Sequence, residues 1–157
     1  MTWVPPEDYF KLIPRKWIGV AAIFSNAEGQ RLLVKPTYRE RWAPVGGLVE
    51  AGESPTQAIM REVKEETGLA LKAPRLLTIE YLHADDPVRG DSIAFTFDGG
   101  VLSENDIASI ELPSEELSAY GFFSLEQCVQ LLGPENRTRV EAVEKARELV
   151  TLAYIER

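Results

Sequence analysis

The sequence predicts an α+β domain in which helices cover the faces of a mixed β-sheet. Strand-like and helix-like segments are interspersed along the chain, without the regular strand–helix–strand alternation that produces a parallel sheet. The chain has 157 residues, which is the size of one domain with a substantial hydrophobic core. Its composition, 45% hydrophobic and 27% charged, is that of an ordinary globular protein, so a disordered or fibrous chain is excluded.

The chain begins with an arm and continues with a predicted hairpin. Residues 1–14 contain three prolines, and we expect an irregular arm with a short helix over 7–12, lying on the surface or packing in a homodimer. The run 17–24 is apolar throughout, which predicts a strand at the centre of the sheet. A turn at 25–30 leads to a second strand at 31–35, and we expect these two strands to pair as a hairpin.

A helix is predicted over residues 55–67 because both of its ends carry local signals. Ser54 has the side chain of an N-cap, and Gln57 occupies the capping-box position. Gly68 can adopt the left-handed conformation that ends a helix. One face of this helix is apolar and is expected to pack inward, through Ile59, Met60, Val63 and Thr67.

The rest of the chain mixes strands and helices. Four apolar runs are expected to form strands, of which the first two pair as a hairpin: residues 75–83, 93–97, 107–112 and 119–123. An acidic, turn-rich loop is expected at 84–91. Ser124 is placed to cap a helix that ends near Leu132, and the amphipathic pattern of 135–149 predicts another helix. The tail, 150–155, fits either an added strand or a surface segment.

A second face of the 55–67 helix is acidic. At about 100° per residue, Glu62, Glu65 and Glu66 fall within an arc of about 100°, roughly 120° away from the apolar face. Like charges this close together need a counter-charge. A solvated acidic surface is one interpretation. The other is a hard divalent cation such as Mg²⁺, held by the carboxylate oxygens with room left for substrate phosphates.

The residues around this acidic face form a longer motif. It consists of Gly47, Glu53, the run Arg61-Glu62-Val63, the pair Glu65-Glu66 and the pair Gly68-Leu69. Their spacing resembles the Nudix box, the signature of the Nudix hydrolases. The resemblance implies a single Nudix domain over residues 1–157, with 1–14 as an N-terminal arm, and it sharpens the predicted fold to an α/β/α sandwich.

The resemblance also implies an activity, which is hydrolysis of a phosphoanhydride bond in a nucleoside diphosphate linked to another moiety, with Mg²⁺ or Mn²⁺ as cofactor. The residues that match the family's metal ligands are Glu62, Glu65, Glu66 and the backbone carbonyl of Gly46. Glu53 and Arg61 match the pair that braces the loop against the helix. Pro87 and Tyr81 do not fit the family's subgroup markers, so nucleoside triphosphates, nucleotide sugars and ADP-ribose all stay open as substrates.

The residue types present favour direct attack by water. His83 and Cys128 are each the single residue of their kind, so the chain offers no Cys–His or Ser–His nucleophile pair and no cluster of such ligands for a metal. Glu62 and Glu65 are the helix candidates for catalysis. Glu116, in a segment beyond the motif, is our candidate general base, and the alternative for it is an acidic residue on the surface.

Three basic residues stand just before the glycine loop. Lys35, Arg39 and Arg41 are our candidates for contact with the substrate's phosphates or leaving group, and solubilising surface charge is the alternative. A Nudix-fold sensor that binds a nucleotide without cleaving it is the alternative function for the whole chain.

Charge and hydropathy narrow the expected partners and location. The net charge of −8 disfavours broad binding to nucleic acid or to an anionic membrane, so we expect a small-molecule nucleotide as partner. No apolar run approaches the ~20 residues that span a bilayer. The N-terminus lacks the pattern of a secretory signal, and we therefore expect a cytoplasmic location.

Overall fold

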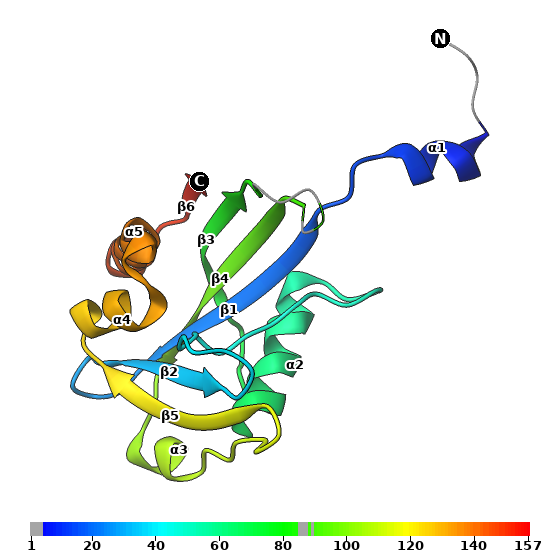
Figure 1. Cartoon of the computed structure of the whole chain (residues 1–157). Coiled ribbons are helices and arrows are strands. Elements are labelled where there is room, and N and C mark those ends of the chain that lie inside the picture. Colours follow the sequence, from blue (N-terminus) through cyan, green and yellow to red (C-terminus); the bar gives the residue numbers. More distant parts are fainter. Residues whose placement is uncertain (1–4, 85–87, 89) are drawn as a thin grey trace.

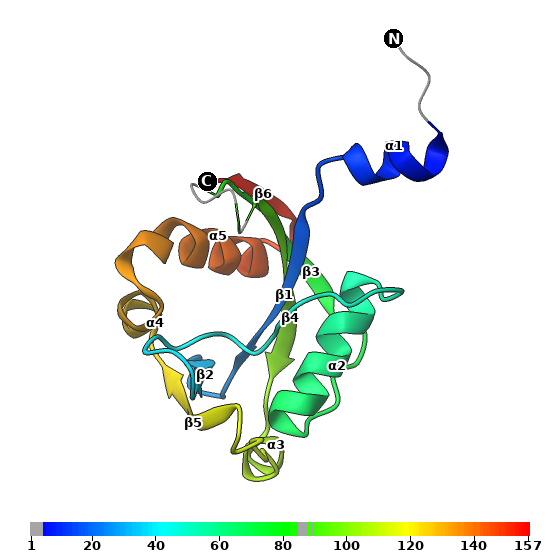
Figure 2. The same ribbon diagram turned by 45° about the vertical axis from the view of Figure 1, so that its right-hand side comes forward.

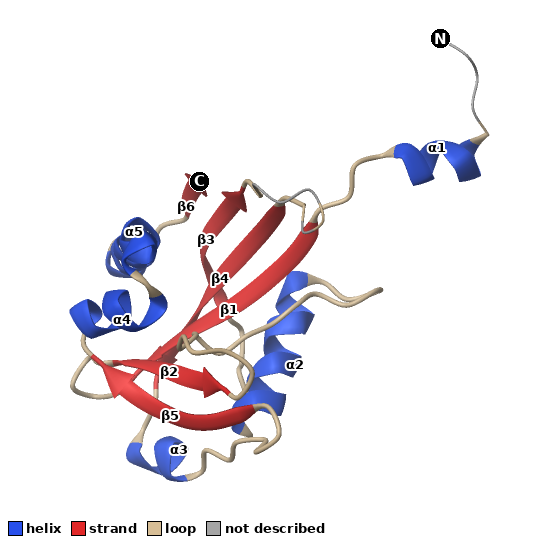
Figure 3. Cartoon of the chain, viewed as in Figure 1, coloured by secondary structure: helices blue, strands red, loops and turns tan. Residues whose placement is uncertain are grey.

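The computed structural model describes residues 5–84, 88 and 90–157. Residues 1–4 of the predicted arm, and 85–87 and 89 of the predicted acidic loop, lie outside the described residues. The helices and strands follow in chain order (Figures 1 and 3): α1 (Pro6–Leu12), β1 (Trp17–Ser25), β2 (Arg31–Pro36), α2 (Pro55–Thr67), β3 (Arg75–Leu82), β4 (Ser92–Val101), α3 (Glu104–Ala108), β5 (Leu117–Phe123), α4 (Leu125–Leu132), the 3-10 helix η1 (Pro134–Asn136), α5 (Arg137–Glu148) and β6 (Ala153–Glu156).

The strands of the described residues form one mixed sheet in the order β5-β2-β1-β4-β3-β6. β1 and β4 pair in parallel, as do β3 and β6, whereas the β3–β4 and β2–β5 pairs are antiparallel. Helix α2 covers one face of the sheet, and α4 and α5 cover the other (Figures 1 and 2). The α/β/α sandwich is therefore confirmed, and β1 lies inside the sheet as its apolar sequence predicts.

The glycine loop fills a gap in the middle of this sheet. β1 and β2 are paired at Ser25 and Arg31, next to the turn, and then diverge. The predicted hairpin is thus formed only at its turn. Residues 43–48 enter the space between the strands, where the N–H of Val20 donates to the carbonyl of Gly47 at 2.9 Å and the N–H of Ala22 to that of Val45 at 2.8 Å. This insertion holds the two glycines beside α2.

Two clusters of buried residues form the core, one on each face of the sheet. On the α2 side, Ile59 and Val63 pack among residues of the central strands. On the α5 side, Leu77 of β3 packs against Val143 and Ala146. Met60, which we expected to face inward, is 41% exposed, because the sheet contacts α2 along a narrower stripe that includes Ala58 instead.

The predicted strand at 107–112 is wrong. Helix α3 covers its first two residues, and the remaining four have no regular structure. Ser103 caps α3, accepting a hydrogen bond from the N–H of Asp106 while the side chain of Asp106 accepts one from the N–H of Ser103. Ile107 and Ile110 still pack against the core. Their apolar character thus reflects burial, whereas the local capping box decides the backbone conformation.

The two ends of the chain differ in their contacts with the sandwich. Helix α1 confirms the short helix expected in the arm, but it buries none of its residues and stands away from the sheet in two views (Figures 1 and 2). β6 pairs with β3, so the tail adds a strand. Among the described residues, no helix has both the length and the apolar character required to cross a bilayer.

Candidate functional site

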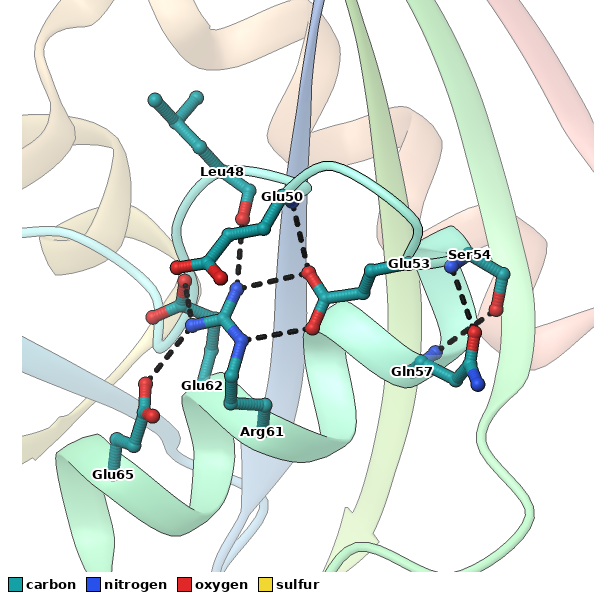
Figure 4. Close-up of polar contacts among 8 residues, drawn as sticks. All are labelled: Leu48, Glu50, Glu53, Ser54, Gln57, Arg61, Glu62 and Glu65. Atoms are coloured by element: carbon teal, nitrogen blue, oxygen red, sulfur yellow. Dashed lines mark hydrogen bonds and ion pairs between the residues drawn. The ribbon is translucent and has the colours of Figure 1, made fainter.

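Helix α2 is held at both ends by the contacts that its sequence predicts. The N–H of Gln57 donates to Oγ of Ser54 at 3.2 Å, and the N–H of Ser54 donates to Oε1 of Gln57 at 2.8 Å (Figure 4). Gly68 adopts the left-handed conformation with φ of 74°, and its N–H donates to the carbonyl of Lys64. These local contacts fix where the helix begins and ends, and therefore the position of each acidic side chain along the helix axis.

Arg61 ties α2 to the loop that precedes it. Its Nε and Nη2 donate to the two carboxylate oxygens of Glu53 at 2.8 and 3.1 Å, and Nη2 also donates to the carbonyl of Leu48 at 2.9 Å (Figure 4). The N–H of Glu50 donates to Glu53 as well. These hydrogen bonds, that from Arg61 most of all, lower the pKa of Glu53 and keep it ionised. The ion pair expected between Glu53 and Arg61 is present, and its fork geometry fixes the loop.

The paired glycines lie against the acidic edge of α2. The N–H of Gly46 donates to Oε2 of Glu66 at 2.8 Å. Gly46 has φ of 147°, and a β-carbon there would lie 2.8 Å from the Cα of Ala21. A β-carbon on Gly47 would lie 2.6 Å from the carboxylate carbon of Glu62. Position 46 therefore excludes a side chain, because the backbone of β1 occupies the space, whereas a side chain at position 47 would displace the carboxylate of Glu62.

The three carboxylates of the acidic edge have different partners. Nη1 of Arg61 donates to Oε1 of Glu62 at 2.8 Å and to Oε2 of Glu65 at 2.9 Å, so Arg61 is the counter-charge for both (Figure 4). Glu66 turns instead to the N–H of Gly46. Within the described residues, no three acidic, histidine or cysteine side chains are gathered as a metal-binding group. The helix brings the carboxylates to one edge, but Arg61 and the loop hold them apart.

Burial affects the charge of two of these carboxylates. It raises the pKa of Glu66 to about 7, with the charge of Glu62 acting in the same direction and the N–H of Gly46 opposing it. Burial also raises the pKa of Glu62, against the lowering effect of Arg61. Glu65 is more exposed than either. Ionising the partly buried carboxylates of Glu62 and Glu66 is thus unfavourable unless a cation compensates the negative charge.

Glu116 lies near the same edge. It is exposed, in the turn before β5, and its charge contributes to the raised pKa of Glu66. Its backbone carbonyl accepts a hydrogen bond from the N–H of Thr37 at 2.8 Å, which ties this turn to the loop after β2. The fold therefore brings together Glu116 and Glu66, which are far apart in sequence.

The predicted basic residues separate into two roles. Nζ of Lys35 donates to the backbone carbonyls of Arg39, at 3.1 Å, and of Glu40, so Lys35 holds the loop in shape. Arg39 and Arg41 line a cavity of about 620 Å³, which Gly46 and Gly47 also line. The cavity lies between the sheet and the layer formed by α4 and α5, since residues of β1, β4 and both helices contribute to its walls.

Several residues of this cavity were not singled out in the sequence. They include Arg139 and Asn136 from the α5 region and Arg157, which follows β6. One signal was available for Arg139, because it stands four residues before the inward-facing Val143 and so shares its helix face. Trp42 also lines the cavity and packs edge-to-face on Phe123, with ring centroids 4.9 Å apart.

In this α/β/α sandwich, an Arg–Glu pair holds a glycine loop against an acidic helix. This arrangement is the architecture of a Nudix domain. A family model described as the NUDIX domain matches residues 15–145, and the chain belongs to this family. The matched range includes the glycine loop, α2 and most of α5.

Curated relatives share the central part of the chain. The ADP-ribose pyrophosphatase of Methanocaldococcus jannaschii is 46% identical over 75 residues, which is 45% of this chain and 44% of that protein. The diphosphoinositol polyphosphate phosphohydrolase 3-alpha of Mus musculus is 30% identical over 124 residues, which is 78% of this chain and 72% of that protein. The first three curated relatives are matched over only 20%, 30% and 44% of their own lengths.

Solved structures show the same fold. The crystal structure of a MutT protein from Methanosarcina mazei superimposes with a TM-score of 0.70 at 27% sequence identity. The match covers 87% of this chain and 99% of that one. The similarity therefore extends over most of the chain, well beyond the short motif around α2.

Proposed function

We propose that the protein hydrolyses a phosphoanhydride bond in a nucleoside diphosphate linked to another moiety, by attack of water and with the help of a divalent cation. One observation carries this proposal: the glycines that lie against the acidic edge of α2 also line the cavity of about 620 Å³. A cavity of that size suits a nucleotide. The arginines in its walls match phosphate oxygens in geometry and charge.

The names of the relatives support a diphosphate substrate. The proteins from M. jannaschii and Bacillus subtilis are named as an ADP-ribose pyrophosphatase and a putative one, at 46% and 37% identity over their aligned segments. ADP-ribose is accordingly the first compound that we would test. Nucleotide sugars and nucleoside triphosphates belong to the same proposed class, because each contains the phosphoanhydride.

The donor set of this edge fits a hard divalent cation, Mg²⁺ or Mn²⁺. Only oxygen ligands are available, and two of the carboxylates are partly buried where uncompensated negative charge is costly. We propose that Glu62, Glu65, Glu66 and the carbonyl of Gly46 hold the metal, which would compete with Arg61 for the first two. A bound divalent cation supplies charge stabilisation and acidifies a water molecule.

The remaining residues have proposed tasks of their own. Glu116, close to the acidic edge, takes the proton of the attacking water, with Glu62 and Glu65 acting beside it.

Arg39 and Arg41 bind phosphate oxygens where they line the cavity. Lys35 keeps their loop in shape through its bonds to the carbonyls of Arg39 and Glu40. Glu53 and Arg61 keep the glycine loop against α2.

A substrate panel tests the proposal directly. Purified protein is incubated at mildly alkaline pH with Mg²⁺ or Mn²⁺ and with ADP-ribose, nucleotide sugars or nucleoside triphosphates, and released phosphate and nucleoside monophosphate are measured. We expect release from at least one compound with either metal and none when a chelator is present. No product from any compound would contradict the proposal.

Glu65→Gln separates the proposed enzyme from a nucleotide sensor of the same fold. In an enzyme, the variant loses turnover while it still binds the nucleotide, because the lost carboxylate acts on the reaction. In a sensor, the wild type binds without turnover and the variant behaves like it. The homodimer and the cytoplasmic location expected from the sequence stay predictions.

A further inference from the structure

The walls of the cavity have the opposite charge to the chain as a whole. The chain carries a net charge of −8. Among the described residues, the charged side chains that line the cavity are nevertheless five arginines and two glutamates: Arg31, Arg39, Arg41, Arg139, Arg157, Glu135 and Glu144. A positive lining in an acidic protein attracts anionic ligands and repels cationic ones.

Two of the five arginines are paired with the two glutamates of the lining, Arg31 in a largely buried pair and Arg41 in an exposed one. Nε of Arg31 donates to Oε1 of Glu144 at 2.9 Å, and Arg41 forms an ion pair with Glu135. Arg39 comes from the loop after β2, and its charge acts on Glu66, so it belongs to the part of the cavity beside the acidic edge. The two remaining arginines are Arg139 and Arg157.

These two guanidinium groups share one buried carboxylate. Glu80 of β3 is 1% exposed, and Nε of Arg157 donates to its Oε1. Nη1 of Arg139 lies 3.7 Å from Oε2 of Glu80, which is beyond hydrogen-bonding distance. Within the described residues, Oε2 has no hydrogen-bond partner. Two guanidinium groups therefore lie around this one buried carboxylate, and the more distant charge of Glu135 also acts on both of them.

Arg139 is the less compensated of the two. Arg157 also donates to the carbonyl of Glu135 and to Oδ1 of Asn136, whereas the side chain of Arg139 forms no hydrogen bond within the described part of the chain. Arg139 keeps about a quarter of its side-chain surface exposed, 26%, and it lines the cavity. Burial lowers the pKa of its guanidinium, and the charge of Arg157 does too, but an arginine stays protonated. An anion from the cavity would supply the missing partner.

The position of this pair separates it from the acidic edge. Glu80 lies on β3, next to the edge strand β6, while the loop that carries Arg39 follows β2, on the other side of β1 and β4. We propose that Arg139 is a specificity-determining residue that binds a second anionic group of the substrate, a phosphate or a carboxylate, apart from the diphosphate. This proposal rests on the proposed function, since it names the substrate class of the same site.

Matched pairs of compounds test it. UDP-glucuronate differs from UDP-glucose by a carboxylate, and ADP-ribose with a 2′-phosphate differs from ADP-ribose by a phosphate. We expect the wild type to prefer the anionic member of at least one pair about tenfold or more, in kcat/KM and in Kd measured by calorimetry, as charged hydrogen bonds of this kind provide. The pair that shows the preference identifies the source of the anion.

Variants on α5 assign the preference to one side chain. In Arg139→Gln the ratio within the pair should fall to near one, with the neutral member changed less than about threefold. Arg137→Gln is the matched control, because Arg137 pairs with Glu126 outside the cavity, and it should keep the ratio. Arg139→Lys keeps the charge and should retain part of the preference.

The outcomes are decisive even if a variant folds poorly. Equal kcat/KM and Kd within both pairs for the wild type would overturn the proposal without any variant, as would a preference that survives in a folded Arg139→Gln protein. If no compound of the whole panel, nucleoside triphosphates included, is hydrolysed, the proposed function fails, and calorimetry with these four compounds still measures the anion preference. The two proposals can therefore fail separately.

Discussion

Gly47 and Glu62 are in such close contact that a β-carbon at position 47 would lie 2.6 Å from the carboxylate carbon of Glu62. This contact joins the loop in the middle of the sheet to the acidic edge of α2. The carboxylate of Glu62 occupies the space that a side chain at position 47 would fill. Glycine is favoured here for that reason and not for its backbone conformation, which is not left-handed.

Gly47→Ala should lower the free energy of unfolding by about 1 to 3 kcal/mol, as overpacking does. The cause is the overlap with Glu62, so the loss should be much smaller when Gly47→Ala is made in a Glu62→Ala background. Urea denaturation of the wild type, both single variants and the double variant measures this coupling. Equal losses in the two backgrounds would show that the overlap is not the cause.

Arg61→Lys should reduce kcat/KM about tenfold or more, as loss of a supporting contact around a metal site does. Lysine cannot bridge both oxygens of Glu53 and the carbonyl of Leu48 with one ammonium group, so the loop loses its fixed position. Met60→Gln is the control on the neighbouring exposed residue of α2, and it should stay close to the wild type. Steady-state kinetics on the best compound of the panel decides between these expectations.

Mn²⁺ should raise the melting temperature of the wild type, since a ligand that binds only the folded state stabilises it. The increase should be smaller in Glu62→Gln and Glu65→Gln, which each remove a proposed ligand. Glu104→Gln, on exposed α3, is the control and should respond like the wild type. A rise of the same size in all four proteins would place the metal elsewhere.

Val150→Gly should stabilise the protein by about 0.5 to 1 kcal/mol. Val150 follows α5 with φ of 51°, a conformation that costs a β-branched residue about 1 to 2 kcal/mol, which exceeds the entropy that a glycine loses. The side chain is 72% exposed, so little packing is lost. Val101→Gly, at an exposed strand residue with negative φ, should destabilise instead, and urea denaturation compares the two.

The free energy of unfolding should fall as the pH rises above the ordinary pKa of a thiol. Burial raises the pKa of Cys128 to about 11 in the folded protein, so between the unfolded value and 11 the folded state binds more protons and loses stability with rising pH. Cys128→Ala removes this contribution and should show a flatter dependence. Urea denaturation from pH 8 to pH 11 measures the difference, and parallel curves would contradict it.

Local signals predict the helix that carries the site and most of the other elements. The capping box of Ser54 and Gln57 and the left-handed Gly68 act within a few residues, and the acidic edge of α2 follows from helical periodicity alone. The same kind of signal at Ser103 produces α3, where the apolar pattern of 107–112 led to the wrong element. Sequence patterns within one segment indicate which residues are buried and where a helix is capped. In α3 the apolar pattern favoured a strand and the capping box favoured a helix, and the helix formed.

Contacts between distant segments required the tertiary structure. The spacing of Arg61 and Glu65 within one helix is a local signal, but only packing shows that Glu66 accepts a hydrogen bond from the N–H of Gly46. The entry of 43–48 between β1 and β2 depends on how the two strands diverge. The sharing of Glu80 by Arg139 and Arg157 joins β3, α5 and the residue that follows β6. Such contacts depend on the relative placement of whole elements, which no local sequence pattern encodes.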